Sequence, residues 1–261
     1  MTRREHASTD DVLAGRRPVL ECLRAGQPVQ RVLIARGLAP SSVVGQIRRR
    51  AERADVEVRV VDRSQIERFA SGLHHQGVIA ITGRFRYASL DSILSRSSAV
   101  LFLDGVMDPH NLGSLLRSAD GAGFAGVVLP ARRAVGVTGA VRRVSAGAAE
   151  VIPVVRVDNL GRALDAARSA GLWIAGLDEK ADEGLWSSSL LEPPVGLVLG
   201  AEDRGISPGV RNHCDGFVRI PSRGRLSSLN VASAGAIAMF EVARRGYVEA
   251  DKASPGRDGS G

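Results

Sequence analysis

Three separated stretches decide the fold: DGVMDPHNLGSLLR at residues 104–117, LVLGAEDRGISP at residues 197–208 and IPSRGRLSSLNVASAGAIAMF at residues 220–240. In each, an apolar run compatible with a buried strand breaks into a loop of glycine, proline and small polar residues, and a helical pattern follows. Loops of this kind, at the carboxyl ends of strands, build ligand pockets in α/β proteins. The stretches therefore predict one pocket assembled from distant parts of the chain.

Apolar runs alternate with helical patterns around these stretches. Strands are expected at residues 100–103, 127–129, 152–155 and 172–177. Strands that alternate with helices predict an α/β domain with a mostly parallel sheet. GAGFAG at residues 121–126 fits GxGxxG, but it ends a helical pattern, whereas a dinucleotide-binding loop follows a strand. We therefore reject a dinucleotide-binding interpretation.

The chain divides where its composition changes. Residues 83–98, GRFRYASLDSILSRSS, are first basic and aromatic and then serine-rich, which is typical of a linker. This linker separates a small α/β domain at residues 11–82 from a larger domain at residues 99–248. The polar tail at residues 249–261 is expected to be disordered.

Composition favours a polyanionic partner. Lys and Arg total 35 against 28 Asp and Glu, so the formal charge is +7, and nucleic acid is the usual partner of such a protein. The alternative is a merely basic protein from an arginine-rich proteome. Cys22 and Cys214 form no CxxC pair, so we expect neither a disulfide framework nor a metal site. We expect a cytoplasmic protein with no membrane segment, because the sequence has no signal peptide and no apolar run of about 20 residues.

The three stretches together resemble the SpoU, or TrmH-like, RNA ribose 2′-O-methyltransferases of the SPOUT class. The residues that carry the resemblance are Asn111 and Arg117, then Gly200-x-Glu202-x-x-Gly205, then Ser228-Leu229-Asn230. AGRRPVLECL at residues 14–23 and HHQGV at residues 74–78 are similar to the branch that methylates a guanosine in large-subunit rRNA. The resemblance implies an α/β trefoil-knot domain after a small RNA-binding domain akin to certain ribosomal proteins. It also implies S-adenosylmethionine as methyl donor, RNA as substrate and a homodimer formed through the final helix.

The resemblance also assigns a set of donor-holding residues. They are Leu199, Gly200, Gly205, Ile220, Leu229, Asn230 and Ala232. Glycines at two of these positions allow the main chain to approach a ligand closely. The sequence departs from the family pattern at Ala232, where serine is usual, and at Ser222-Arg223, where methionine and a small residue are common.

The expected catalytic residues are Arg117, Asn111, Glu202, Ser228 and Asn230. The resemblance places Arg117 at the ribose 2′-hydroxyl, and since an arginine pKa is above about 12, we favour a phosphate clamp that stabilises the developing alkoxide over a free base. The alternative is an ordinary surface arginine. Six residues span about 240° of a helix, so Asn111 and Arg117 converge only if Asn111 lies at or before the helix cap. Glu202 either orients Asn111 or another arginine, or is a carboxylate at the start of a helix. Ser228 and Asn230 either position the ribose and the donor or cap the last helix. These two functions are compatible, because a cap and a ligand contact can share one loop.

RNA contacts are expected from Arg16, Arg17, Arg48, Arg49, His75, Gln76, Arg142 and Arg143. Arg48 and Arg49 are either a solvated helix face or a phosphate-binding surface. His75 and Gln76 lie in a turn that touches RNA or fixes the loop, and Arg142 or Arg143 serves the partner's site in a dimer. Phe85 and Tyr87 of the linker stack on unpaired bases or pack the linker onto a domain.

The expected activity is methylation of a guanosine ribose in large-subunit rRNA. Two alternatives stay open, namely the same chemistry on tRNA and a non-catalytic RNA-binding or ribosome-assembly protein that keeps the fold.

Overall fold

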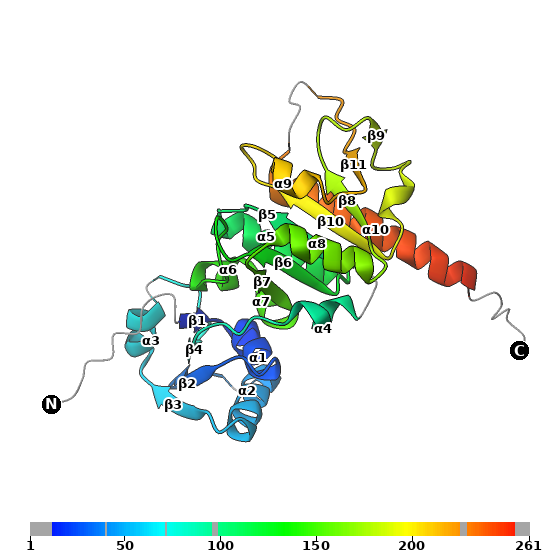
Figure 1. Ribbon diagram of the computed structural model, residues 1–261. Coiled ribbons are helices and arrows are strands. Elements are labelled where there is room, and N and C mark those ends of the chain that lie inside the picture. Colours follow the sequence, from blue (N-terminus) through cyan, green and yellow to red (C-terminus); the bar gives the residue numbers. More distant parts are fainter. Residues whose placement is uncertain (1–11, 40, 71, 96–98, 225–228, 254–261) are drawn as a thin grey trace, which may run out of the picture.

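The computed structural model of the chain describes residues 12–39, 41–70, 72–95, 99–224 and 229–253. These residues form two α/β domains, one coloured blue to cyan and the other green to red in Figure 1. The predictions for residues 1–11, for Ser228 and for the last eight residues of the tail lie outside the described residues.

The N-terminal domain is a four-stranded sheet with helices on both faces. Its elements are β1 (Val12–Ala14), α1 (Arg16–Arg24), β2 (Val29–Ala35), α2 (Ser42–Arg53), β3 (Glu57–Val61), α3 (Arg63–Ala70) and β4 (Val78–Thr82). The strand order is β1-β4-β2-β3, and β2 and β3 are parallel. Because successive side chains of a strand face opposite sides, β4 directs Val78 and Ala80 toward α1 and α2, and Ile79 and Ile81 toward α3.

The larger domain is a seven-stranded sheet in which the recorded strand pairs are parallel. Its elements are α4 (Leu90–Leu94), β5 (Ala99–Asp104), α5 (Pro109–Gly121), β6 (Gly126–Pro130), α6 (Gly139–Val144), α7 (Ala148–Val151), β7 (Val154–Val157), α8 (Leu160–Ser169), β8 (Trp173–Leu177), β9 (Glu183–Gly184), a 3-10 helix (Ser189–Leu191), β10 (Val195–Gly200), α9 (Pro208–Arg211), β11 (Gly216–Arg219) and α10 (Val231–Ala253). The strand order is β7-β6-β5-β10-β8-β11-β9. The sequence-based expectation of a mostly parallel sheet is confirmed.

Helices bury both faces of this sheet, which explains the unbroken apolar run of β5. Leu101 and Leu103 face α5 and α10, while Val100 and Phe102 face α8 and α4. The small residues at the start of α10 serve this packing within the chain. A Cβ added at Gly235 would lie 2.5 Å from Leu115 Cδ2 and 2.7 Å from Leu199 Cδ1, so α10 lies directly on α5 and β10.

The linker packs onto the larger domain, and the last helix continues into the expected tail. Ile93 of α4 is part of the core of the larger sheet, and Phe85 and Tyr87 pack onto the same domain, so packing is the function of these two rings that the structure supports. Helix α10 continues to Ala253, beyond the expected start of the disordered tail. The chain between β11 and α10 passes through residues 225–228, which lie outside the described residues, and the knot therefore stays a prediction. Within the described part of the chain, no helix is long and apolar enough to cross a membrane.

Candidate functional site

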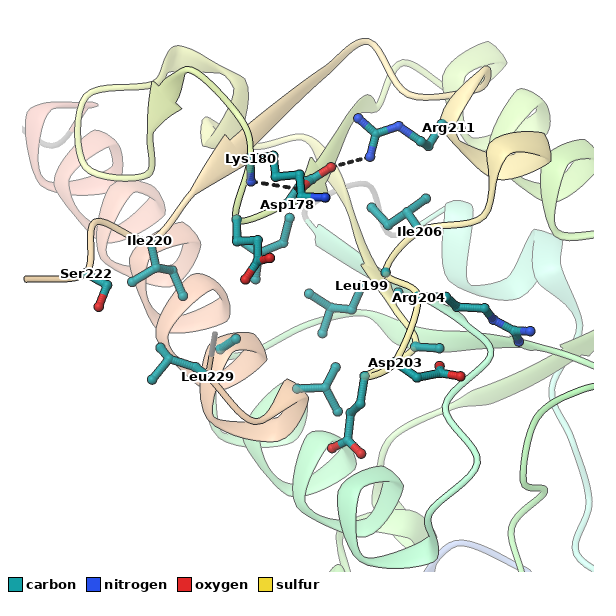
Figure 2. A pocket seen from close by; sticks show the side chains of 18 of the residues that line it. Asp178, Lys180, Leu199, Asp203, Arg204, Ile206, Arg211, Ile220, Ser222 and Leu229 are labelled. Atoms are coloured by element: carbon teal, nitrogen blue, oxygen red, sulfur yellow. Dashed lines mark hydrogen bonds and ion pairs between the residues drawn. The ribbon is translucent and has the colours of Figure 1, made fainter. Parts of the chain in front are cut away.

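One cavity of about 750 Å³ opens at the carboxyl ends of β10, β8 and β11, three neighbouring strands of the larger sheet (Figure 2). Parallel strands end at the same edge of a sheet, so the loops that follow them meet there. Apolar side chains line much of the cavity, and they come from the ends of β8 and β10, from the loops that follow the strands, and from the first turns of α10: Leu177, Leu199, Ile206, Ile220, Leu229, Val231 and Ala234. The second and third sequence stretches therefore line one cavity, whereas none of the described residues that line it comes from the first stretch.

The loop after β10 requires glycine at two positions. Ala201 and Gly205 exchange both backbone hydrogen bonds, with N···O distances of 2.8 and 3.1 Å, so the chain folds tightly back on itself. A Cβ at Gly200 would lie 2.0 Å from the carbonyl carbon of Gly205, and Gly205 itself has a φ of +66°, which favours glycine. Asp104, at the end of β5, holds the exit of the loop by accepting the N–H of Ser207 at 2.7 Å.

A network of three side chains lies beside this loop, with one member from each sequence stretch. Asn111 Nδ2 donates to Glu202 Oε1 at 2.5 Å, and Asn230 Nδ2 donates to Asn111 Oδ1 at 3.0 Å and to Glu202 Oε1 at 2.9 Å. Asn230 also caps α10, because its Oδ1 accepts the N–H groups of Ala232 at 2.9 Å and Ser233 at 3.3 Å. The cap and the network are thus two functions of one side chain.

The opposite wall of the cavity carries an ion pair between Asp178, just after β8, and Arg211 of α9. The N–H of Lys180 also donates to Asp178 Oδ1 at 2.9 Å, and the Arg211 guanidinium lies 4.0 Å from the centre of the Phe217 ring. Partial burial on its own raises the pKa of Asp178, but the N–H of Lys180 and the guanidinium of Arg211 outweigh it and hold that pKa below its usual value. Asp178 is therefore a charged, fixed acceptor at neutral pH.

Residues 98–240 match the SpoU rRNA Methylase family, which covers the larger domain with its cavity and network. The chain belongs to the SpoU rRNA methylase family. Residues 12–88 match a second family, RNA 2′-O ribose methyltransferase substrate binding, which covers the N-terminal domain.

Relatives of this SpoU protein match it over nearly their whole length. A Staphylococcus aureus protein assigned to the TrmH family of tRNA/rRNA methyltransferases is 36% identical over 242 residues, which cover 90% of this chain and 96% of the relative. An rRNA methyltransferase from Sinorhizobium meliloti, solved with AdoMet bound, is 26% identical with a TM-score of 0.77 and covers 89% of this chain and 86% of its own. The SpoU methyltransferase AviRb from Streptomyces viridochromogenes, in complex with the cofactor AdoMet, is 27% identical with a TM-score of 0.75 and covers 94% of both chains. The fold is that of the SPOUT methyltransferases.

Most residues expected to hold a ligand line the SpoU cavity. These are Leu199, Gly200, Gly205, Ile220 and Leu229. Ala232 is not among the lining residues, and its N–H instead supports the cap made by Asn230. Ser228 precedes Leu229 but lies outside the described residues.

Arg117 takes a different position from Asn111. Asp108 caps α5 by accepting the N–H of His110 at 3.1 Å, so Asn111 is already the third residue of the helix. The condition for convergence is not met, because both residues lie inside one regular helix and leave it on different sides. Arg117 is exposed and does not line the cavity, and its assignment to the ribose hydroxyl stays a prediction.

The structure corrects two of the expected RNA contacts. Arg142 is 3% exposed and forms an ion pair with Glu150, because the N-terminal domain packs over α6 and covers it. His75 is also buried, and its Nδ1 accepts the N–H of Gly77 at 3.0 Å, so it fixes its own loop. Side chains that are partly or fully exposed, and thus still open to RNA, are Arg16, Arg17, Arg48, Arg49, Gln76 and Arg143.

Two groups of residues that border cavities were not predicted from the sequence. Asp178, Glu179 and Lys180 line the cavity directly after β8, and the signal was available in the charged DEK triplet that ends an apolar strand. Arg36 and Arg63 border a second cavity of about 280 Å³ on the N-terminal domain, together with Arg16 and Gln76. Their grouping depends on tertiary structure, since they come from separate segments.

Proposed function

We propose that this chain transfers a methyl group from S-adenosylmethionine to a ribose 2′-hydroxyl of RNA, with a guanosine in large-subunit rRNA as the target. The observation that carries the proposal is the network of Asn111, Glu202 and Asn230 beside the cavity. It joins the three motif segments of a SpoU protein in one arrangement, and Glu202 also lines the cavity.

The cavity fits the methyl donor. Its volume of about 750 Å³ lies within the range of small-molecule sites, which is about 300 to 1,000 Å³. Apolar walls from Leu199, Ile220 and Leu229 suit an adenine ring, and carboxylates of Asp178, Glu202 and Asp203 suit hydroxyl, ammonium or sulfonium groups. When bound, S-adenosylmethionine supplies an electrophilic methyl group on a positively charged sulfur.

The polar network holds the reaction geometry. Glu202 accepts from both amides and is thereby fixed, while Asn230 is fixed further by the start of α10. Groups held in this way keep the ribose oxygen and the methyl group aligned without reorganisation during the reaction.

Arg117 stabilises the negative charge that develops on the ribose oxygen. Because guanidinium groups do not act as free bases in proteins, the hydroxyl proton leaves to water or to an RNA phosphate. Its exposed position on α5 suits contact with a large substrate that covers this face. The bidentate guanidinium also suits an RNA phosphate next to the target ribose.

RNA docks on the N-terminal domain through exposed cations. Arg16 and Gln76 border the second cavity with Arg36 and Arg63, and guanidinium groups around a hollow of about 280 Å³ suit one RNA phosphate and its nucleotide. Arg17, Arg48 and Arg49 extend the basic surface, and Arg143 provides a cation on the larger domain.

We also propose that two copies associate through α10. Phe240 on α10 is 53% exposed and Leu229, two residues before the helix begins, is 49% exposed, so two large apolar side chains are available for a second copy to bury. Light scattering at micromolar concentration tests the homodimer, and a Phe240→Arg variant is expected to be monomeric. A monomeric parent protein would exclude this assembly.

Incubation with labelled methyl donor and total RNA, followed by fragment mapping, tests the proposed function. Label in one large-subunit rRNA guanosine ribose is the expected result. Label in a tRNA loop would move the target to tRNA. Calorimetry separates the non-catalytic alternative, because a protein that binds neither the donor nor its demethylated product cannot perform the reaction.

A further inference from the structure

The two domains meet at a buried polar junction. Helix α1 packs against α7, and β1 packs against α6. Between them lie Cys22 and Thr82 of the N-terminal domain and Arg142 and Glu150 of the larger domain, all of them buried. We call these four residues the Arg142 junction.

Both charged residues of the junction lie in the larger domain, and the other hydrogen bonds of Arg142 reach the N-terminal domain. Arg142 Nε donates to Glu150 Oε1 at 2.5 Å and Nη2 donates to Oε2 at 3.0 Å, so α6 and α7 hold a bidentate pair whose side chains are 4% and 0% exposed. The guanidinium then donates across the interface, from Nη1 to Thr82 Oγ1 at 2.7 Å and from Nη2 to Cys22 Sγ at 3.2 Å. The Arg142 guanidinium is therefore hydrogen-bonded by residues of both domains.

This arrangement specifies an orientation more than it adds binding strength. When the two domains dock, the Arg142–Glu150 ion pair is removed from water. This costs free energy unless the remaining N–H donors of Arg142 find acceptors. Buried N–H groups without an acceptor add a further penalty. Only the placement that brings Thr82 and Cys22 to Arg142 avoids that penalty, so other placements of the two domains are disfavoured.

The linker supports the same placement. Gln27 and Arg86 exchange two hydrogen bonds, of 3.0 and 3.3 Å, which fasten the start of the linker to the N-terminal domain. Farther along, Tyr87 Oη accepts the N–H of Val137 at 3.0 Å, and the N–H of Ala88 donates to Val154 O at 2.8 Å. The linker is thus an extension of both domains and not a free tether.

We propose that Arg142 is a positioning residue, which fixes the distance and angle between the RNA-docking surface of the N-terminal domain and the cavity of the larger domain. The junction then selects RNA in which the docked element and the target ribose are held at a matching separation. This inference rests on the proposed function, and it adds a determinant of substrate choice that touches neither RNA nor donor.

Thiol labelling tests the junction directly, because Cys22 and Cys214 are the two cysteines of the chain. In a Cys214→Ser background, Cys22 reacts with a soluble thiol reagent only when the junction opens. Thr82→Val keeps the Arg142–Glu150 pair but removes an acceptor across the interface, so we expect labelling about 10-fold faster than in the parent. Arg143→Met, the exposed neighbour on the same helix, is the matched control and is expected to leave the labelling rate unchanged.

Kinetics with RNA tests the consequence. Thr82→Val is expected to raise the KM for RNA by about 10-fold, with kcat within about twofold and with donor affinity unchanged. The salt dependence of RNA binding stays as in the parent, whereas loss of a phosphate contact would reduce its slope by about 1. Arg142→Lys keeps a positive charge for Glu150 but loses the several N–H donors of the guanidinium. It is therefore also expected to raise the KM for RNA and the labelling rate of Cys22.

Two results would overturn the proposal. If Cys22 were labelled at the parent rate in Thr82→Val and in Arg142→Lys, the junction would not hold the two domains together. Faster labelling with an unchanged KM would mean that domain placement does not select RNA. A parent protein that methylates no RNA would refute the proposed function alone, since the labelling rates still report whether the junction closes.

Discussion

The side-chain amide of Asn230 donates a hydrogen bond to the side-chain oxygen of Asn111 at 3.0 Å, although 119 positions of sequence separate the two residues. Both also bond to Glu202, so the polar centre of the site is a closed set of three side chains. Its closure depends on the start of α10, because Asn230 is also the cap of that helix. The site and the last helix should therefore respond together to changes at Asn230.

Asn230→Ala is expected to lower kcat/KM by at least about 100-fold, because the two amide hydrogen bonds that fix Asn111 and Glu202 are lost. The same change removes a helix cap, which costs about 1 kcal/mol and lowers Tm by about 2–4 °C in a chain of this size. Asn230→Ser separates the two effects, since serine caps but cannot replace both amide bonds. We expect it to recover Tm and not activity; recovery of both would show that the network has no catalytic function.

Gly200→Ala is expected to abolish donor binding, because the new Cβ would lie 2.0 Å from the carbonyl carbon of Gly205 and the loop cannot keep its fold. Gly205→Ala meets no atom within 4 Å, so its cost is the strain of φ +66°, about 1 kcal/mol, and donor affinity should fall by about 10-fold or less. Gly209→Ala, with open space and ordinary backbone, is the control. Calorimetry with S-adenosylmethionine ranks the three, and equal affinities for all would contradict the tight-loop account.

Arg117→Ala is expected to keep the dissociation constant of the donor and to lose about 100- to 1,000-fold in kcat, because Arg117 stabilises charge that appears only during transfer. Arg117→Lys should recover part of the lost kcat, since the ammonium group of lysine keeps the positive charge but not the planar set of N–H donors of arginine. Single-turnover methylation of RNA measures the effect. Near-normal turnover of Arg117→Ala would show that Arg117 is an ordinary surface arginine without a catalytic function.

Asp178→Asn is expected to lower Tm at neutral pH, because the amide no longer pairs as a charge with Arg211. Since the pKa of Asp178 in the folded chain lies below its usual value, the stability from this carboxylate is present above the ordinary aspartate pKa and is lost as pH falls through the lower, folded-state pKa. The Tm difference between parent and variant should therefore stay constant from pH 7 to about pH 5 and shrink on further acidification. A difference that grows on acidification would show that the ion pair is not its origin.

Sequence patterns predicted the convergence of the loops because each loop follows a strand of a parallel sheet, and such strands end at a common edge. They could not distinguish Arg142 from Arg143, since the two are adjacent and chemically identical. The difference arises from the N-terminal domain, which covers α6 at Arg142 and leaves Arg143 in solvent. The charged triplet after β8 indicated a polar group at this edge of the sheet, but the pairing of Asp178 with Arg211 depends on the strand order β10-β8-β11 and was not predictable from sequence.

The cap that Asn230 provides lies close to the end of the folded chain, whereas Asn111 and the loop after β10 are synthesised earlier. During translation, a growing chain that has already emerged as far as β11 still lacks one wall of the cavity and one corner of the polar network. The residues that line the cavity run from Leu177 to Ala234, so the cavity gains its last wall only when the first turns of α10 are in place.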